Sequence, residues 1–148
     1  IRVTHMGRAH SADWAAAANA EAKENSRYVW RGEIPHWQVR REFARTRLMV
    51  ISSNQEGGAN VVSEAVVAGV PVLASDISGN VGLLGANYPG YYPVGDERAL
   101  AEQMLRVERD PKALILLEKY CRALAPGFTP QRETAGLRAV LARLKPAQ

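Results

Sequence analysis

Short runs of apolar residues alternate along the chain with longer segments whose composition favours helix. The short runs have the length of buried strands, and the longer segments have the length of helices. The expected strands are residues 1–7, 27–33, 47–53 and 71–76, with 90–94 as an edge strand. The expected helices are residues 11–26, 36–46, 61–69, 97–110, 112–125 and 131–144, with a short turn or helix at 81–85.

Strands that alternate with helices and read as continuous apolar runs are typical of a parallel sheet covered on both faces. The sequence therefore predicts an α/β fold: a Rossmann-like parallel sheet with helices on both faces and further helices at the C-terminus. Residues 1–148 are expected to form a single domain. The expected helix-end signals are Ser11 or Asp13, Gly69, Asp96 and Pro111.

The composition fits an ordinary globular protein, with 47% hydrophobic and 23% charged residues among 148. The net charge of +4 is spread along the chain, and no dense run of Lys and Arg could follow a nucleic-acid backbone. A single cysteine, Cys121, can form neither an internal disulfide nor a cysteine metal cluster. No apolar run approaches the ~18 residues of a membrane span. We expect a soluble, cytoplasmic protein.

Metal binding is not expected, because His5, His10 and His36 do not have the spacing of metal ligands. No Asp-x-Asp element stands beside the glycine loop described next. We expect neither a metal ion nor a cofactor.

Candidate chemistry lies in the loop between the strand 47–53 and the helix 61–69. In a doubly wound sheet, ligands bind outside the carboxyl ends of the strands, where loops run into helices. Gly57 and Gly58 allow the backbone to approach a ligand, and the N–H groups of residues 59–62 would suit a phosphate. The alternative is an ordinary tight turn.

Two carboxylates flank these glycines, Glu56 in the loop and Glu64 in the helix. With Asn60 as the N-cap, Glu64 falls one position beyond the place from which a capping-box Glu reaches back. The rest of that helix is almost entirely apolar, so a carboxylate there needs hydrogen-bond donors, and sugar or ribose hydroxyls are suitable. Glu56 could serve a second set of hydroxyls. The alternatives are a solvated loop acid for Glu56, and for Glu64 an ion pair with Arg45 or Arg47.

The segment "EGGANVVSE" resembles the E-x7-E pattern of the retaining family-4 glycosyltransferases, and "EAVVAGVPVLASDISGN" continues that pattern. The segments "YVWRGEIPH" and "YYPVGDERALAEQM" are similar to the same family's C-terminal, donor-binding domain. The resemblance covers nearly the whole chain. It implies a metal-independent enzyme that binds a nucleotide sugar, with UDP-N-acetylglucosamine as a candidate donor.

The resemblance also implies roles for individual positions. The helix carboxylate would hold the ribose hydroxyls, the loop carboxylate would be the catalytic residue beside the donor sugar, and the loop amides would face the diphosphate. The turn after the second strand of this chain would hold the base through its backbone. By position, these roles fall on Glu64, on Glu56, on Gly57, Gly58, Ala59, Asn60 and Val61, and on Gly32, Glu33 and Ile34, respectively.

A narrower resemblance is to the selenosugar synthases of selenoneine biosynthesis, carried by "EGGANVVSEA", "GNVGLLG" and "YPGYYPVGD". It implies transfer of N-acetylglucosamine from UDP to selenophosphate.

The chain departs from the family in lacking the Arg and Lys that lie near the first strand of the donor domain and neutralise the diphosphate. It begins at Ile1, already in a strand, so we expect a piece of a longer protein that is inactive without its N-terminal domain. The missing first strand would lie between strands 1–7 and 47–53. We therefore expect these two strands to close up, or another segment to fill the gap.

A further expectation concerns the last helix. Its apolar stripe of Leu137, Val140, Leu141 and Leu144 should be exposed or in contact with another copy.

Two other functions fit the residues less closely. One is a non-catalytic nucleotide-sugar-binding module, or one subunit of a two-chain enzyme. The other is an unrelated Rossmann-type domain in which the two glutamates are structural.

Overall fold

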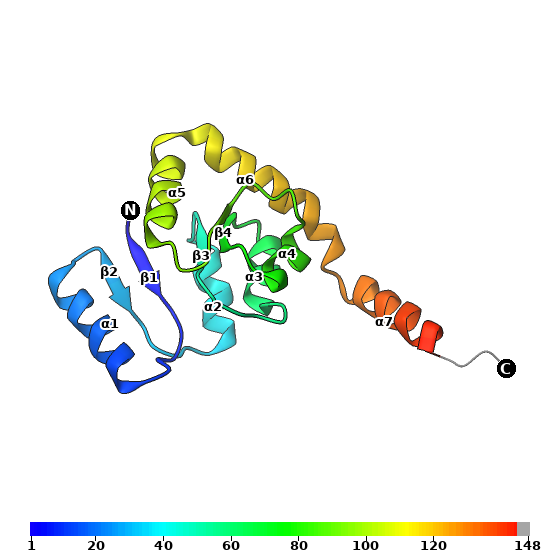
Figure 1. Cartoon of the computed structure of the whole chain (residues 1–148), viewed down its shortest axis with the longest axis horizontal. Helices are drawn as coiled ribbons and strands as arrows, with labels where there is room; N and C mark the ends of the chain where they lie inside the picture. Colours follow the sequence, from blue (N-terminus) through cyan, green and yellow to red (C-terminus); the bar gives the residue numbers. More distant parts are fainter. Residues whose placement is uncertain (145–148) are drawn as a thin grey trace. The chain divides into compact units, whose positions relative to one another are not determined.

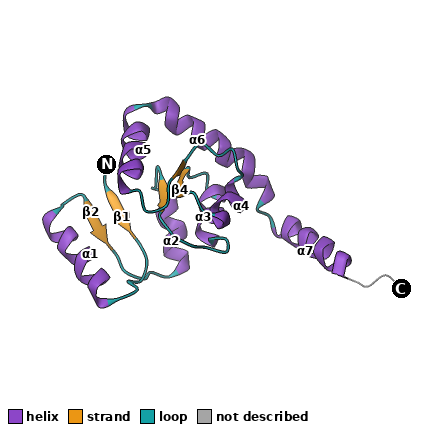
Figure 2. Ribbon diagram, viewed as in Figure 1, coloured by secondary structure: helices purple, strands orange, loops and turns teal. Residues whose placement is uncertain are grey.

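A computed structural model describes residues 1–144 as helices and parallel strands joined by short loops (Figures 1 and 2). The chain divides into two compact units, residues 1–45 and 46–148, and each is described by itself. The α/β, Rossmann-like fold class predicted from the sequence is confirmed.

The first unit is a β-α-β element followed by a helix. Its elements are β1 (Val3–His5), α1 (Ala12–Glu24), β2 (Tyr28–Trp30) and α2 (His36–Phe43). Strands β1 and β2 are parallel, with Val3 opposite Tyr28 and His5 opposite Trp30. A crossover helix such as α1 is what a parallel pair requires, and α1 packs against β2.

The second unit holds a three-stranded parallel sheet in the order β3-β4-β5. Its elements are β3 (Met49–Ile51), α3 (Asn60–Val67), β4 (Val72–Ser75), α4 (Ser78–Leu84), β5 (Tyr91–Tyr92), α5 (Glu97–Arg109), α6 (Pro111–Leu124), a 3₁₀ turn (Ala125–Gly127) and α7 (Pro130–Leu144). Every residue of the central strand β4 is buried, so both of its faces are covered. Helices α3 and α5 both pack against this strand.

The core of the second unit is built on the apolar face of α3. Val62, Ala65 and Val66 of α3 have no exposed surface, and neither do Val72 and Leu73 of β4. Burying an aliphatic side chain stabilises the fold by about 1.5–3 kcal/mol. The loop that precedes α3 is therefore anchored at both ends, by β3 and by a well-packed helix.

The strands of the two units are not paired with one another. Among residues 1–144, β1 pairs only with β2, and β3 pairs only with β4. The expected closing-up of strands 1–7 and 47–53 is therefore wrong, and the alternative, that another segment lies between them, stays a prediction.

The helix-end signals are confirmed. Ser11 and Asp96 are N-caps whose side chains accept hydrogen bonds from Trp14 N (3.3 Å) and Ala99 N (2.8 Å). Pro111 is the first residue of α6, and Gly69 follows α3 with a φ of 77°, where a residue with a Cβ would be strained.

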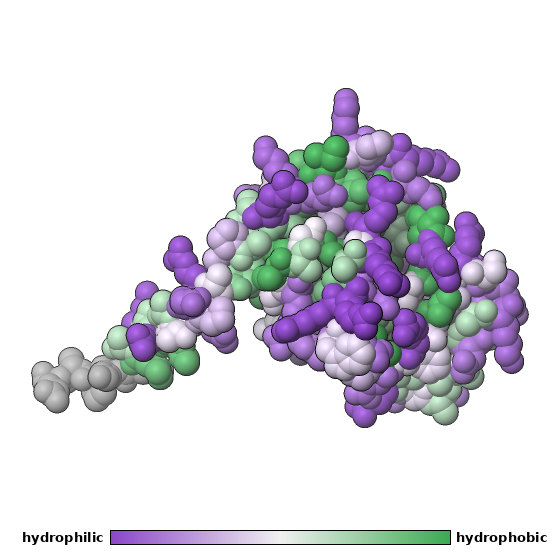
Figure 3. Space-filling model, turned by 180° about the vertical axis from the view of Figure 1, so that it is seen from behind, coloured by the Kyte–Doolittle hydropathy of each residue, from purple (hydrophilic) through white to green (hydrophobic). Residues whose placement is uncertain are grey.

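The expected apolar stripe on α7 has three residues whose side chains are described, and all three are exposed. Leu137, Val140 and Leu141 keep 61%, 54% and 53% of their surface exposed, and apolar atoms are visible along α7 in Figure 3. The side chain of Leu144 lies outside the described residues.

The hydroxyl of Tyr88 completes the backbone hydrogen bonding of β4 before β5 begins. It donates to Val72 O (2.6 Å) and accepts from Val72 N (3.1 Å), with Cys121 Sγ 3.5 Å away. Burial raises the pKa of Tyr88 far above its ordinary value. This single hydroxyl therefore satisfies two buried backbone groups that no strand reaches.

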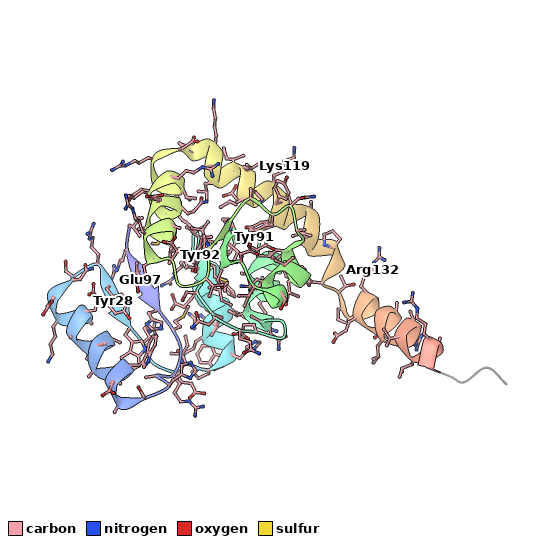
Figure 4. All side chains as sticks on the ribbon, viewed as in Figure 1. Tyr28, Tyr91, Tyr92, Glu97, Lys119 and Arg132 are labelled. Atoms are coloured by element: carbon pink, nitrogen blue, oxygen red, sulfur yellow. The ribbon has the colours of Figure 1, made fainter. Side chains whose placement is uncertain are left out.

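We predict that Tyr88→Phe lowers the free energy of unfolding by about 1–3 kcal/mol, because Val72 N–H and C=O both lose their partner. Tyr91→Phe is the matched control, since its more accessible hydroxyl donates to Gly85 O at 3.0 Å (Figure 4). Urea denaturation measures both variants. Equal losses in the two variants would contradict the role given to Tyr88.

A second prediction concerns alkaline pH. Burial raises the pKa of Tyr92 to about 12, and its hydroxyl donates to Ile51 O at 2.8 Å. A raised pKa means that the stability contributed by the neutral phenol is complete below the unfolded value of about 10 and is lost between about pH 10 and 12. Unfolding free energy should thus fall less steeply over that range in Tyr92→Phe than in the wild type. An unchanged slope would contradict this assignment.

Candidate functional site

The candidate site is the loop between β3 and α3 together with the first turns of α3 and α4. The loop leaves β3 at its carboxyl end, which is where ligands bind in a doubly wound sheet. Helix α3 begins at Asn60, and its N-cap is Ala59, which makes no side-chain cap bond. The expected N-cap at Asn60 is therefore wrong by one residue.

The backbone donors of this turn are partly used within the protein. Val62 N donates to Ala59 O at 2.9 Å, so this N–H is not among the groups that could face a phosphate. Asn60 and Val61 are the first two residues of α3, where N–H groups have no partner inside the helix by geometry. The backbone N–H groups that could bind an anion are therefore those of the residues that precede Val62.

Glu64 is the fifth residue of α3 and is half-buried. Since Ala59 is the cap, Val62 occupies the position from which a capping-box side chain reaches back. Capping therefore does not explain Glu64. The next two residues of the helix, Ala65 and Val66, are fully buried, so Glu64 stands at the edge of the apolar face of α3.

Glu56 is half-buried, and one of its carboxylate oxygens, Oε1, accepts a hydrogen bond from Ser53 Oγ at 2.9 Å. The carboxylate is thus not fully solvated, and the choice between a binding role and a solvated loop acid stays a prediction. A carboxylate held by a neighbouring hydroxyl loses rotamer freedom and so keeps a defined direction.

The two glycines leave open space above the loop. A Cβ added at Gly57 or Gly58 would meet no heavy atom within 4 Å. Gly58 has a φ of 138°, which residues with a Cβ rarely adopt. The backbone here is accessible, and at Gly58 its conformation requires glycine.

The sequence did not single out Gly79, a residue of α4 that packs against this loop. A Cβ on Gly79 would overlap the carbonyl oxygen of Glu56 and lie 2.8 Å from its carbonyl carbon. The neighbouring Asn80 lies inside α4, whose N-cap is Ile77. Asn80 is completely buried. A Gly-Asn pair after a buried strand was the available signal, and it could have indicated close packing.

Gly32, Glu33 and Ile34 lie in the loop between β2 and α2 of the first unit. Gly32 has a φ of 61°, and its carbonyl oxygen accepts a hydrogen bond from Gly7 N at 2.9 Å. Glu33 is exposed, while Gly32 and Ile34 are half-buried. Their role in binding a base stays a prediction.

Residues 1–144 contain no group of His, Cys, Asp and Glu arranged to hold a metal ion. No helix within them is both long enough and apolar enough to pass through a bilayer.

Comparison with known proteins identifies the class to which this fold and site belong. Residues 13–123 match the family described as glycosyl transferases group 1, and the chain is a member of that family. It is 32% identical over 83 residues to the "Putative teichuronic acid biosynthesis glycosyltransferase TuaC" of Bacillus subtilis (strain 168), which covers 56% of this chain and 21% of that protein.

Solved structures share the fold over nearly the whole chain. Anabaena Alr3699/HepE, in complex with UDP and glucose, has a TM-score of 0.81 at 18% identity, covering 97% of this chain and 41% of its own. Sucrose-phosphate synthase from Thermosynechococcus elongatus has a TM-score of 0.77 at 22% identity, covering 96% and 38%. The pneumococcal O-GlcNAc transferase GtfA, in complex with UDP and GlcNAc, has a TM-score of 0.76 at 15% identity, covering 97% and 29%. The chain thus spans less than half the length of these proteins.

We predict that Gly58→Ala destabilises the protein by about 1–3 kcal/mol, because alanine is strained at a φ of 138°. Gly57→Ala is the matched control, since its added methyl group meets nothing and its φ is ordinary. Its effect should stay within about 0.5 kcal/mol. Thermal denaturation compares the two variants, and an equal loss in both would show that the loop does not depend on the conformation at Gly58.

Proposed function

We propose that this protein binds the nucleotide-sugar donor of a retaining glycosyl transfer, with a UDP-sugar as the donor. The observation that carries the proposal is the segment 53–64. It follows strand β3, holds the Glu56 carboxylate through Ser53, leaves open space over two glycines and places Glu64 in an apolar helix.

The assignment of roles follows from the chemistry of a nucleotide sugar. A diphosphate needs N–H donors, which the glycine loop and the start of α3 supply. Ribose and sugar hydroxyls need acceptors, and a carboxylate can only accept. Glu64 would hold the ribose, and Glu56 would hold the transferred sugar as the catalytic residue.

The choice of UDP is supported by related folds. HepE and the transferase GtfA are described in complexes with UDP, the latter together with GlcNAc. We propose the same nucleotide for this chain, with N-acetylglucosamine as the sugar and selenophosphate as the acceptor implied by the narrower resemblance. We also propose that this chain is the donor-binding half of a two-domain enzyme in the cytoplasm.

In this mechanism the enzyme stabilises charge more than it performs proton transfer. As the bond between sugar and diphosphate breaks, negative charge develops on the leaving group, and donors aimed at it lower the barrier. The amides of the segment 57–61 would supply part of that stabilisation. The Arg and Lys of the family, and the acceptor site, would have to come from residues outside this sequence.

We predict that Glu64→Gln weakens UDP binding by about 10- to 100-fold, because hydrogen bonds to a charged acceptor contribute roughly 1.5–3 kcal/mol. Glu97→Gln is the matched control, because Glu97 is an exposed carboxylate in the first turn of α5 (Figure 4). Isothermal titration calorimetry measures both affinities, with NAD as a ligand that should not bind.

Two results would contradict the proposal. One is an absence of UDP binding by the wild type, and the other is equal affinity in Glu64→Gln and the wild type. Preferred binding of NAD would favour an unrelated nucleotide-binding domain.

A further inference from the structure

The packing of α4 against the glycine loop leaves no room for a side chain at position 79. A Cβ on Gly79 would overlap Glu56 O and would lie 2.8 Å from Glu56 C and 3.1 Å from Gly58 N. The two distances to the Glu56 carbonyl group are shorter than real Cβ atoms show, and the distance to Gly58 N is tighter than most real contacts. All three atoms belong to the backbone, which cannot rotate away. Gly79 therefore fixes how closely α4 approaches the loop that carries Glu56.

A chain of hydrogen bonds connects the next residue of α4 to the carboxylate of Glu56. Asn80 Nδ2 donates to Ser75 O (2.9 Å) and to Ser75 Oγ (3.2 Å). Ser75 Oγ donates to Ser53 O (2.6 Å), and Ser53 Oγ donates to Glu56 Oε1 (2.9 Å). These hydrogen bonds thus run from α4 through the end of β4 and the second residue after β3 to one carboxylate oxygen.

The inner part of this series of hydrogen bonds consists of polar side chains buried in the core, where apolar side chains would cost less free energy. Asn80 has no exposed surface, and its Oδ1 accepts no hydrogen bond among the described residues. A buried acceptor without a partner lowers the stability of the fold, because it has lost its hydrogen bonds to water. An apolar side chain of similar size would avoid that cost but would not hold Ser75. The arrangement therefore holds the loop in position at a cost to the stability of the core.

We propose that Gly79, Asn80, Ser75 and Ser53 are positioning residues for Glu56, and that they determine how well the protein holds the sugar part of its donor. This inference rests on the proposed function. None of the four residues needs to touch the nucleotide. Their loss should therefore affect the sugar and leave the UDP part of the affinity almost unchanged.

The test compares affinities for UDP, UDP-N-acetylglucosamine and UDP-glucose by isothermal titration calorimetry. The quantity of interest is the ratio of the Kd for UDP to the Kd for the UDP-sugar that the wild type binds best. Glu56→Gln removes the charge of the carboxylate directly, so the fall in the ratio in this variant is the largest effect that the positioning residues could have. Gly79→Ala and Ser53→Ala should each lower the ratio by about fivefold to tenfold, which is the effect of one ordinary hydrogen bond and is smaller than the loss expected when the charge itself is removed.

Two matched variants distinguish a loss of the position of Glu56 from a general loss of stability. Gly82→Ala adds a methyl group to the same helix α4 where nothing lies within 4 Å, and the ratio should not change. Ser53→Thr keeps the hydroxyl that reaches Glu56 and should restore most of what Ser53→Ala loses. If Gly79→Ala does not fold, the comparison of Ser53→Ala with Ser53→Thr decides the question.

The outcomes distinguish this inference from the proposed function. If the wild type binds neither UDP nor a UDP-sugar, the proposed function fails. If it binds UDP but holds neither UDP-sugar more tightly than UDP, the inference is overturned while nucleotide binding stands. A ratio that is unchanged in Ser53→Ala, or a proportional loss for UDP and UDP-sugar in Gly79→Ala, also overturns it.

Discussion

The first turn of α4 rests directly on the backbone of the loop after β3, and this contact exists only because residue 79 has no side chain. The contact joins two connections that leave neighbouring parallel strands at the same edge of the sheet. Strand β4 is buried along its whole length, so its end cannot move to accommodate a displaced loop. The geometry of the loop is therefore set by the core of the second unit and not by the loop sequence alone.

In the same region, polar side chains are buried where apolar ones would give a more stable core. Most of the core is aliphatic, as expected for a strand covered on both faces, but Ser75 and Asn80 are buried beside it with 1% and 0% of their surface exposed. Buried polar groups lower stability unless they are fully hydrogen-bonded, and functional sites are where proteins keep them. By contrast, the hydroxyl of Tyr88 satisfies both Val72 N and Val72 O, and we assign it a structural role.

The fold could be predicted from the sequence because it depends on patterns that act locally. The apolar runs predicted the strands. The helix ends were predicted by the caps at Ser11 and Asp96 and by the glycine after α3. The loop with Glu56 and Glu64 was also predictable, because its residue types are unusual for an otherwise apolar strand-loop-helix segment. The Gly-Asn pair could indicate close packing, but the particular contacts of Gly79 and hydrogen bonds of Asn80 could not be predicted, because they depend on how α4 meets the loop that follows β3. The cap of α3 was placed one residue late, since Asn60 suits a cap but is already helical.

A crystal structure of the protein with UDP-N-acetylglucosamine tests the central claim most directly. The account predicts ribose hydroxyls donating to the Glu64 carboxylate, sugar hydroxyls donating to Glu56, and the diphosphate above Gly57 and Gly58. In that complex, Ser53 Oγ should still donate to Glu56 Oε1, as it does here at 2.9 Å. A nucleotide bound away from the segment 53–64, or a Glu64 side chain turned from the ribose into an ion pair with Arg45 or Arg47, would contradict the account.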